Sequence, residues 1–72
     1  MAKITFEITQ HLAVLSENAN GWTKEINLVS WNGRPPKYDI REWSEDHTSM
    51  SKGVTLTQEE MAMILETLND IK

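Results

Sequence analysis

The sequence predicts an α+β fold in which a four-stranded antiparallel sheet is followed by one C-terminal helix. Two observations lead to this prediction. Stretches of alternating apolar and polar residues are separated by turns that contain Asn and Gly, and a capping box then opens a stretch of helical periodicity. With 72 residues, the chain is expected to form one small domain, residues 1–72, which is marginally stable without staples or a partner.

The first strand is expected within residues 3–16, because apolar side chains occupy its even positions, with a bend near Gln10 and His11. These side chains are Ile4, Phe6, Ile8, Leu12 and Val14. Residues 17–21 have the composition of a turn, since Asn and Gly tolerate positive φ. The pattern predicts a long first strand that turns back into a second.

The second and third strands are expected over residues 22–31 and 37–43, joined by a hairpin. Asn32-Gly33 is the strongest short hairpin signal, and Pro35 and Pro36 indicate a connection longer than two residues. After the polar loop 44–53, residues 54–56 can form a short fourth strand. The meander is therefore expected to be antiparallel.

Strand alternation also assigns the side chains to two faces. Even positions supply aliphatic side chains and are expected to form the core face, whereas odd positions on the second and third strands are expected to face away from the core. The odd set contains Trp31, Lys37, Arg41 and Trp43. Tryptophans and cations on one exposed face indicate a binding surface.

A capping box at residues 57–60 predicts a helix that runs to about Asp70 and covers the core face of the sheet. Its apolar stripe is Met61, Ile64, Leu65, Leu68 and Ile71. Met63 and Ala62 lie partly outside this stripe and leave apolar surface for a second subunit. The expected dimer contacts are Met61, Met63, Ile64 and Leu68.

Composition narrows the class of function. The net charge is −4, but residues 21–41 hold four cations against two acids, so one face could be locally positive. There is no cysteine, and His11 and His47 lie far apart, so no metal, cofactor or small-molecule substrate is expected. Without a nucleophile and a convergent partner, an enzyme is the least supported option. No signal peptide or membrane span is apparent, so a cytoplasmic protein is expected, with nucleoid association as an option.

Three segments, taken in order, resemble a known family. Residues 31–34 (Trp-Asn-Gly-Arg), residues 39–43 (Asp-Ile-Arg-Glu-Trp) and residues 52–60 (Lys-Gly-Val-Thr-Leu-Thr-Gln-Glu-Glu) are similar to the single-stranded-DNA-binding domain of the transcriptional coactivator positive cofactor four. The similarity is closest to its small bacterial relatives of the YdbC type. It covers nearly the whole chain.

The resemblance implies a homodimer whose curved sheets hold single-stranded DNA. Trp31 takes the place of a base-stacking aromatic, and Arg41 that of a phosphate-binding arginine. Arg34 and Lys52 take the places of lysines, and Trp43 that of a second stacking residue, although the family's Tyr-Trp pair is here contracted to one tryptophan. The full set of expected nucleic-acid-binding residues is Lys24, Trp31, Asn32, Gly33, Arg34, Lys37, Arg41, Trp43 and Lys52. The acidic, serine-rich arm of the eukaryotic coactivator is absent, which argues against activator-dependent transcription.

The chemistry of these residues agrees with this function and leaves alternatives open. Aromatic side chains stack on unpaired bases of any sequence, so the expected function is single-stranded DNA binding with little sequence specificity, in repair, replication or transcription. Single-stranded RNA offers the same base faces and phosphates and is an alternative. A protein-interaction module anchored by Trp31 and Trp43 is another.

Overall fold

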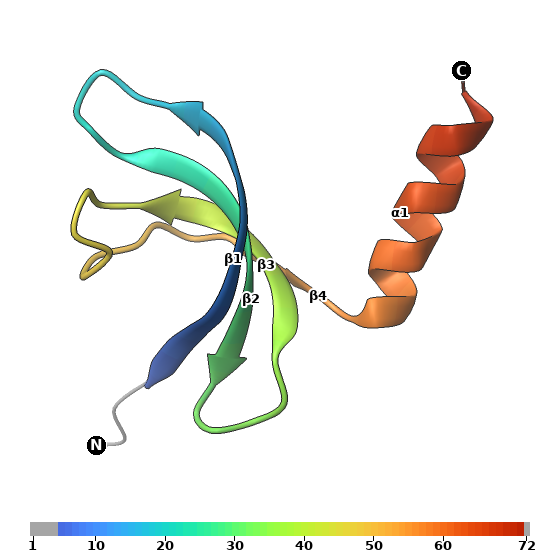
Figure 1. Ribbon diagram of the computed structural model, residues 1–72, viewed down its shortest axis with the longest axis horizontal. Helices are drawn as coiled ribbons and strands as arrows, with labels where there is room; N and C mark the ends of the chain where they lie inside the picture. Colours follow the sequence, from blue (N-terminus) through green and yellow to red (C-terminus); the bar gives the residue numbers. More distant parts are fainter. Residues whose placement is uncertain (1–4, 72) are drawn as a thin grey trace.

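A computed structural model of the protein describes residues 5–71 and contains four strands and one helix (Figure 1). The elements are β1 (Phe6–Glu17), β2 (Thr23–Trp31), β3 (Lys37–Trp43), β4 (Val54–Leu56) and α1 (Gln58–Asp70). The strands form one antiparallel sheet in the order β1-β2-β3-β4. The predicted α+β fold and its order of elements are confirmed, while Ile4 lies outside the described residues.

The two hairpins follow the predicted turn chemistry. In the first, the Asn18 amide donates to the Trp22 carbonyl at 2.7 Å, and Gly21 has a φ of 88°. In the second, Asn32 and Gly33 have φ values of 53° and 75°, and the chain reaches β3 only at Lys37. Two successive residues with positive φ are the pattern of a type I′ turn, and the prolines lengthen the connection as expected.

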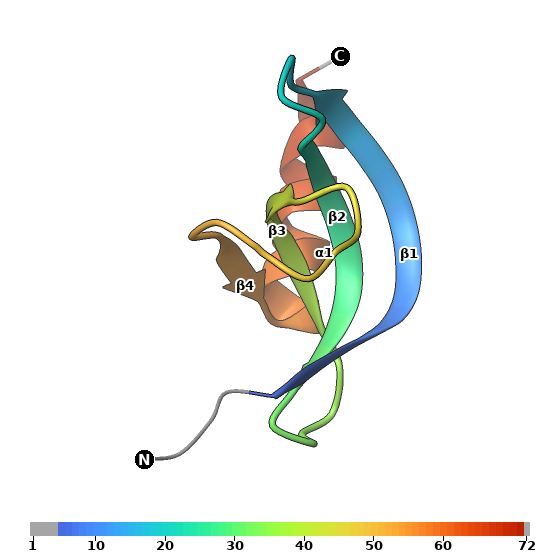
Figure 2. The same ribbon diagram turned by 90° about the vertical axis from the view of Figure 1, so that its left-hand side faces the viewer.

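Strand β1 departs from simple alternation. Its pairing with β2 shifts register at three points, between Ile8 and Gln10, between His11 and Ala13, and between Val14 and Ser16. Each irregularity moves the following side chains to the other face and bends the strand. The bend expected near Gln10 and His11 is therefore present, and it is one of several that curve β1 around the sheet (Figure 2).

The two faces of the sheet differ from the sequence-based expectation. The long loop after β3 lies on the concave side, and α1 lies beyond the opposite, convex side (Figure 1). The odd positions of β2 and β3, expected to be the exposed face, hold the fully buried Val29 and Trp43. The even positions, expected to be the core, are only half-buried at Ile26, Leu28 and Ile40. The assignment of faces by parity was wrong, because the odd face carries its own packed core.

Helix α1 begins with the predicted capping box. The Thr57 hydroxyl accepts a hydrogen bond from the Glu60 amide at 3.1 Å, and the Glu60 carboxylate accepts one from the Thr57 amide at 2.8 Å. Within residues 5–71, α1 contacts β3 and β4 alone and buries Met61 alone. The expectation that the helix covers the sheet was therefore wrong. No helix within these residues is long and apolar enough to cross a membrane.

Candidate nucleic-acid interface

A row of aromatic side chains crosses the concave face from the end of β2 to the loop after β3. Phe6 lies between Trp31 and Trp43, with ring centroids 5.9 Å and 5.3 Å away, and His47 lies 5.7 Å beyond Trp43. Trp31 is half-buried, whereas Trp43 is fully buried. The register explains the row, because Phe6 is paired with Trp31 across β1 and β2.

Arg41 lies against this row. Its guanidinium carbon is 4.7 Å from the centre of the Trp31 ring, a cation–π geometry. The same guanidinium forms a two-pronged ion pair with Asp39, at 2.5 Å from Nε to Oδ1 and 2.8 Å from Nη2 to Oδ2. The side chain of Arg41 remains 13% exposed, while that of Asp39 is fully buried. The arginine is thus held in one orientation on the tryptophan, with part of its surface open to solvent.

The segment before β4 fixes Arg41 from the other side. Its Nη1 donates to the Ser51 carbonyl at 3.4 Å and approaches the Met50 sulfur at 3.3 Å. A Cβ atom at Gly53 would clash with the Arg41 side chain and with the carbonyl of Ile40. Only glycine therefore lets the loop approach β3 this closely.

A second buried carboxylate, Glu25, lies near the middle of the concave face and is 2% exposed. The Thr23 hydroxyl donates to it at 2.5 Å and Asn27 Nδ2 at 3.1 Å, and His47 Nε2 lies 2.9 Å from it. Burial alone would raise the pKa of Glu25, but the hydrogen bonds from Thr23, Asn27 and His47 together lower it below its usual value. The side chain is therefore an ionised carboxylate with its partners in place.

The turn between β2 and β3 has a structural role as well as an exposed surface. Asn32 is hydrogen-bonded to Thr5 through both its backbone and its side chain. Its amide donates to the Thr5 carbonyl at 2.8 Å, and its side-chain Oδ1 accepts from the Thr5 amide at 2.9 Å. The Arg34 carbonyl accepts a hydrogen bond from the Ser30 hydroxyl at 2.7 Å. Gly33 has open space around it. Of the three expected site residues here, Asn32 mainly fastens the turn, and the Arg34 side chain is exposed.

The expected cations do not all lie on one face. Lys37 begins β3 on the same side as Asp39 and Arg41, opposite Val29, and is exposed. Lys24 has the parity of Ile26 and lies on the convex face, so it is separated from Trp31 by the sheet. Lys52 and Arg34 are exposed on loops at the two ends of β3. The structure thus groups Lys37 with Trp31 and Arg41 and separates Lys24 from them.

Trp43 requires the main correction. It was expected to point out of the core, yet it is fully buried beneath the loop after β3, between Phe6 and His47. The same loop forms a backbone bridge from Met50 to Trp43. A residue in this position packs the domain, and any contact with a base would first require the loop to move. The expected dimer contact Met61 is likewise buried within its own chain.

Sequence reasoning missed Phe6 and the buried polar residues Glu25, Asn27 and Asp39. A signal for the polar set exists, because Thr23, Glu25 and Asn27 are spaced two apart, as are Asp39 and Arg41. Such spacing puts complementary groups side by side on one face of a strand. These are the groups that hydrogen-bond to each other in the structure. Phe6 could not be placed, because the register of β1 cannot be read from alternation.

The curved antiparallel sheet, the C-terminal helix and the arginine-covered tryptophan define a small binding domain that presents a concave aromatic surface. The chain belongs to the Transcriptional Coactivator p15 (PC4) family, which it matches over residues 18–67. It is also 48% identical over 66 residues to an uncharacterized protein of Treponema pallidum, covering 92% of this chain and 78% of that protein. The family resemblance found in the sequence is therefore confirmed, and membership supports a nucleic-acid-binding, coactivator-like class of domain.

Proposed function

We propose that this protein is a non-enzymatic, homodimeric domain that binds single-stranded DNA with little sequence specificity, in DNA repair, replication or transcription. The strand would lie along the concave face and stack a base on Trp31, while Arg41, Lys37, Arg34 and Lys52 would contact phosphates. Stacking suits single strands, because a duplex hides the faces of its bases. Trp43 supports this surface from below without touching the strand.

The cation–π pair of Trp31 and Arg41 is the observation that carries the proposal. A half-buried aromatic ring with a guanidinium 4.7 Å above it joins the two groups that single strands require, a stacking surface and a phosphate-binding cation. Asp39 holds the guanidinium in place through two hydrogen bonds, so little side-chain entropy would be lost on binding. The charge of Arg41 is partly balanced by Asp39, so the exposed Lys37 adds the positive charge that a polyanion needs.

The homodimer is supported by the apolar surface of α1. Met63, Ile64, Leu65, Leu68 and Ile71 are between 38% and 71% exposed, and Val54 on β4 is 55% exposed. A contiguous apolar surface of this kind is unusual on a small monomer and is typical of an interface. A second copy that packs against this helix and the convex face would leave the concave face free. Of the expected dimer contacts, Met63, Ile64 and Leu68 fit this role.

The test is the titration of a fluorescent oligothymidine with the protein at two salt concentrations, followed by anisotropy. Replacing Trp31 with Ala should weaken binding by about 1 to 3 kcal/mol, the usual value of one stacked base. Replacing Lys37 with Ala should reduce the salt slope by about 0.7, as expected for one lost contact with a single strand. Lys24→Ala is the matched control, since Lys24 is an exposed strand lysine on the opposite face, and it should leave both quantities unchanged.

Other outcomes would identify the alternatives. Equal affinity for duplex and single-stranded DNA would refute the proposal, as would Trp31→Ala and Lys37→Ala variants that bind like the unmodified protein. Tighter binding to a matched RNA oligomer would assign the surface to RNA. If no oligonucleotide binds with a salt-dependent affinity, the surface would instead serve as a protein-interaction module.

A further inference from the structure

The short edge strand β4 contributes a hydroxyl to the concave face. Thr55 is paired with Asp39 across β3 and β4, and paired residues share a face of the sheet, so Thr55 lies on the side of Asp39 and Arg41. Its hydroxyl donates to Asp39 Oδ2 at 2.9 Å, although Thr55 is exposed and Asp39 is fully buried. An exposed threonine is therefore bonded to the carboxylate that holds the arginine of the interface.

The carboxylate of Asp39 joins Thr55 to Arg41. Its Oδ1 accepts from Arg41 Nε, and its Oδ2 accepts both from Arg41 Nη2 and from the Thr55 hydroxyl. A two-pronged ion pair keeps the carboxylate and the guanidinium close to one plane. A donor on β4 that fixes the carboxylate therefore also fixes the plane of the guanidinium that lies on Trp31.

The hydrogen bonds of Arg41 leave one donor for a ligand. A guanidinium has five N–H groups. Asp39 accepts from Nε and from Nη2, whereas the Met50 sulfur and the Ser51 carbonyl accept from Nη1. In the described part of the chain, the second N–H of Nη2 has no partner, and the side chain is 13% exposed. A phosphate that binds Arg41 without breaking these bonds must therefore use Nη2, the nitrogen that is bonded to Asp39 Oδ2.

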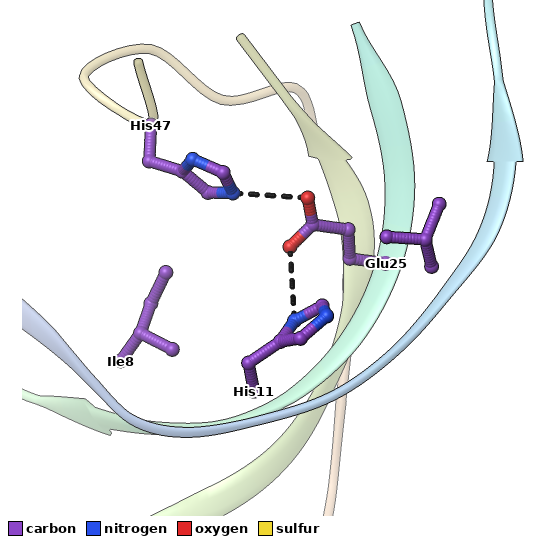
Figure 3. A pocket seen from close by; sticks show the side chains of 5 residues that line it. Ile8, His11, Glu25 and His47 are labelled. Carbon is purple, nitrogen blue, oxygen red and sulfur yellow. Dashed lines mark hydrogen bonds and ion pairs between the residues drawn. The ribbon is translucent and has the colours of Figure 1, made fainter. Parts of the chain in front are cut away.

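The other buried carboxylate of the concave face holds no arginine. Glu25 lies between His11 and His47, and each ring points one nitrogen at its carboxylate (Figure 3). Its ion pairs among residues 5–71 are with these histidines alone. Glu25 also accepts from a threonine of its own face, Thr23. The two carboxylates thus share the threonine donor, but only that of Asp39 orients a cation on the aromatic surface.

We propose that Thr55 is a positioning residue of the nucleic-acid interface, which acts through Asp39 to hold the Arg41 guanidinium in the orientation that binds a phosphate. Without the hydroxyl, the carboxylate has one fixed donor fewer and the arginine has more orientations, which a bound strand must then restrict. The inference rests on the proposed function and deepens it, because it makes β4 part of the site although its hydroxyl need not touch the strand.

The test replaces Thr55 with Val, which has a similar shape but no hydroxyl. The affinity for a fluorescent oligothymidine, measured by anisotropy, should fall about 5-fold, as expected for one net hydrogen bond. Thr55→Ser keeps the hydroxyl and should restore most of the affinity. Thr23→Val is the matched control, because it also removes a hydroxyl from a buried carboxylate of the concave face, and it should bind like the unmodified protein. A loss confined to Thr55→Val therefore does not come from reduced stability alone.

A double-mutant cycle with Arg41→Lys shows whether Thr55 acts through Arg41. Lysine keeps the positive charge beside Asp39 but has no guanidinium plane to orient. In this background, the loss caused by Thr55→Val should shrink from about 5-fold to less than about 2-fold. If the exposed Thr55 contacts the strand directly, the full loss would persist in the Arg41→Lys background, and the positioning role would be refuted.

The orientation of the guanidinium is also measured without a nucleic acid. Arg34 and Arg41 are the two arginines of the chain, so the Nε–H signal of Arg41 in the nitrogen-15 NMR spectrum is the one that Arg41→Lys removes. Its exchange with water should be slow in the unmodified protein and in Thr55→Ser, and faster in Thr55→Val, because the acceptor of this N–H is less firmly held. Equal exchange in all three proteins would refute the role of Thr55.

The outcomes separate this inference from the proposed function. If the unmodified protein binds no oligothymidine, the proposed function and this inference fail together. If Trp31→Ala weakens binding but Thr55→Val does not, the proposed function stands and the role of Thr55 is refuted. A Thr23→Val variant that loses as much affinity as Thr55→Val would refute it as well, because the effect would then not depend on Arg41.

Discussion

The concave face of the sheet buries charged side chains, whereas the outer surface of α1 exposes apolar ones. The concave face buries the carboxylates of Glu25 and Asp39, yet each accepts hydrogen bonds from side chains of the same chain. The helix instead exposes Leu68 and its apolar neighbours to solvent. The difference shows that one chain completes the concave face, whereas the helix carries an apolar surface that a single copy leaves in water.

The largest effect is expected from Trp43→Ala on the concave face. Trp43 is fully buried and packs against Phe6 and His47, so its removal leaves a cavity that should cost about 3 to 5 kcal/mol of unfolding free energy. Urea denaturation followed by circular dichroism measures this loss. Trp31→Ala is the comparison, since Trp31 is half-buried and should cost clearly less stability while weakening DNA binding more. Equal losses of stability would mean that the two tryptophans have the same structural role.

The contrast between these tryptophans shows where sequence-based prediction ends. The order of elements, both hairpin turns and the capping box could be predicted, because each depends on residues that are close in sequence. The assignment of faces could not, because it assumed that charged side chains avoid the core. Asp39 and Glu25 are buried since their partners, Arg41 in one case and Thr23 and Asn27 in the other, lie on the same face.

The candidate site could be predicted only in part, because alternation along a strand can be read from the sequence but the register between strands cannot. Trp31, Lys37 and Arg41 share a face because they lie on neighbouring strands with matched parity, and the structure does group them. Phe6 enters this group through the register of β1, which depends on three irregularities that leave no clear pattern in the sequence. The same irregularities bring His11 opposite Asn27, to which it is hydrogen-bonded. Lys24 is an even position of β2, so strand alternation alone places it on the face opposite Trp31 and Arg41.

The next effect concerns the helix and tests the proposed dimer. Leu68→Glu places a charge on its exposed apolar surface, and a leucine buried in an interface contributes about 1.5 to 3 kcal/mol. The unmodified protein should sediment as a dimer with a melting temperature that rises with concentration, and the variant should sediment as a monomer. Thr67→Glu is the control on an adjacent, exposed position. A variant that remains dimeric would place the interface elsewhere.

A smaller effect is expected from acid on the concave face. The hydrogen bonds to Glu25 lower its pKa in the folded protein below the ordinary value of 4.5, which applies to the unfolded chain. The carboxylate therefore binds a proton less tightly in the folded state than in the unfolded state. The stabilisation is therefore complete above that value and is lost as the pH falls through the lower, folded pKa. Urea midpoints measured from neutral to acidic pH should fall less steeply for Glu25→Gln than for the unmodified protein. Glu66→Gln, on the exposed helix, should follow the unmodified protein, and a parallel course for all three would exclude this role of Glu25.

The smallest effect on stability should come from the start of α1, where the helix follows β4 of the sheet. Thr57→Ala removes the hydroxyl that accepts from the Glu60 amide and should cost about 1 kcal/mol, measured by thermal unfolding. Thr57→Ser should restore most of this loss, whereas Thr67→Ala, in the helix interior, should be neutral or slightly stabilising. Among the described residues, α1 contacts β3 and β4 alone, so the cap should matter for the order of the helix within one chain. If Thr57→Ala has no effect in the dimer but lowers stability in the Leu68→Glu background, the second subunit, and not the cap, would order the helix.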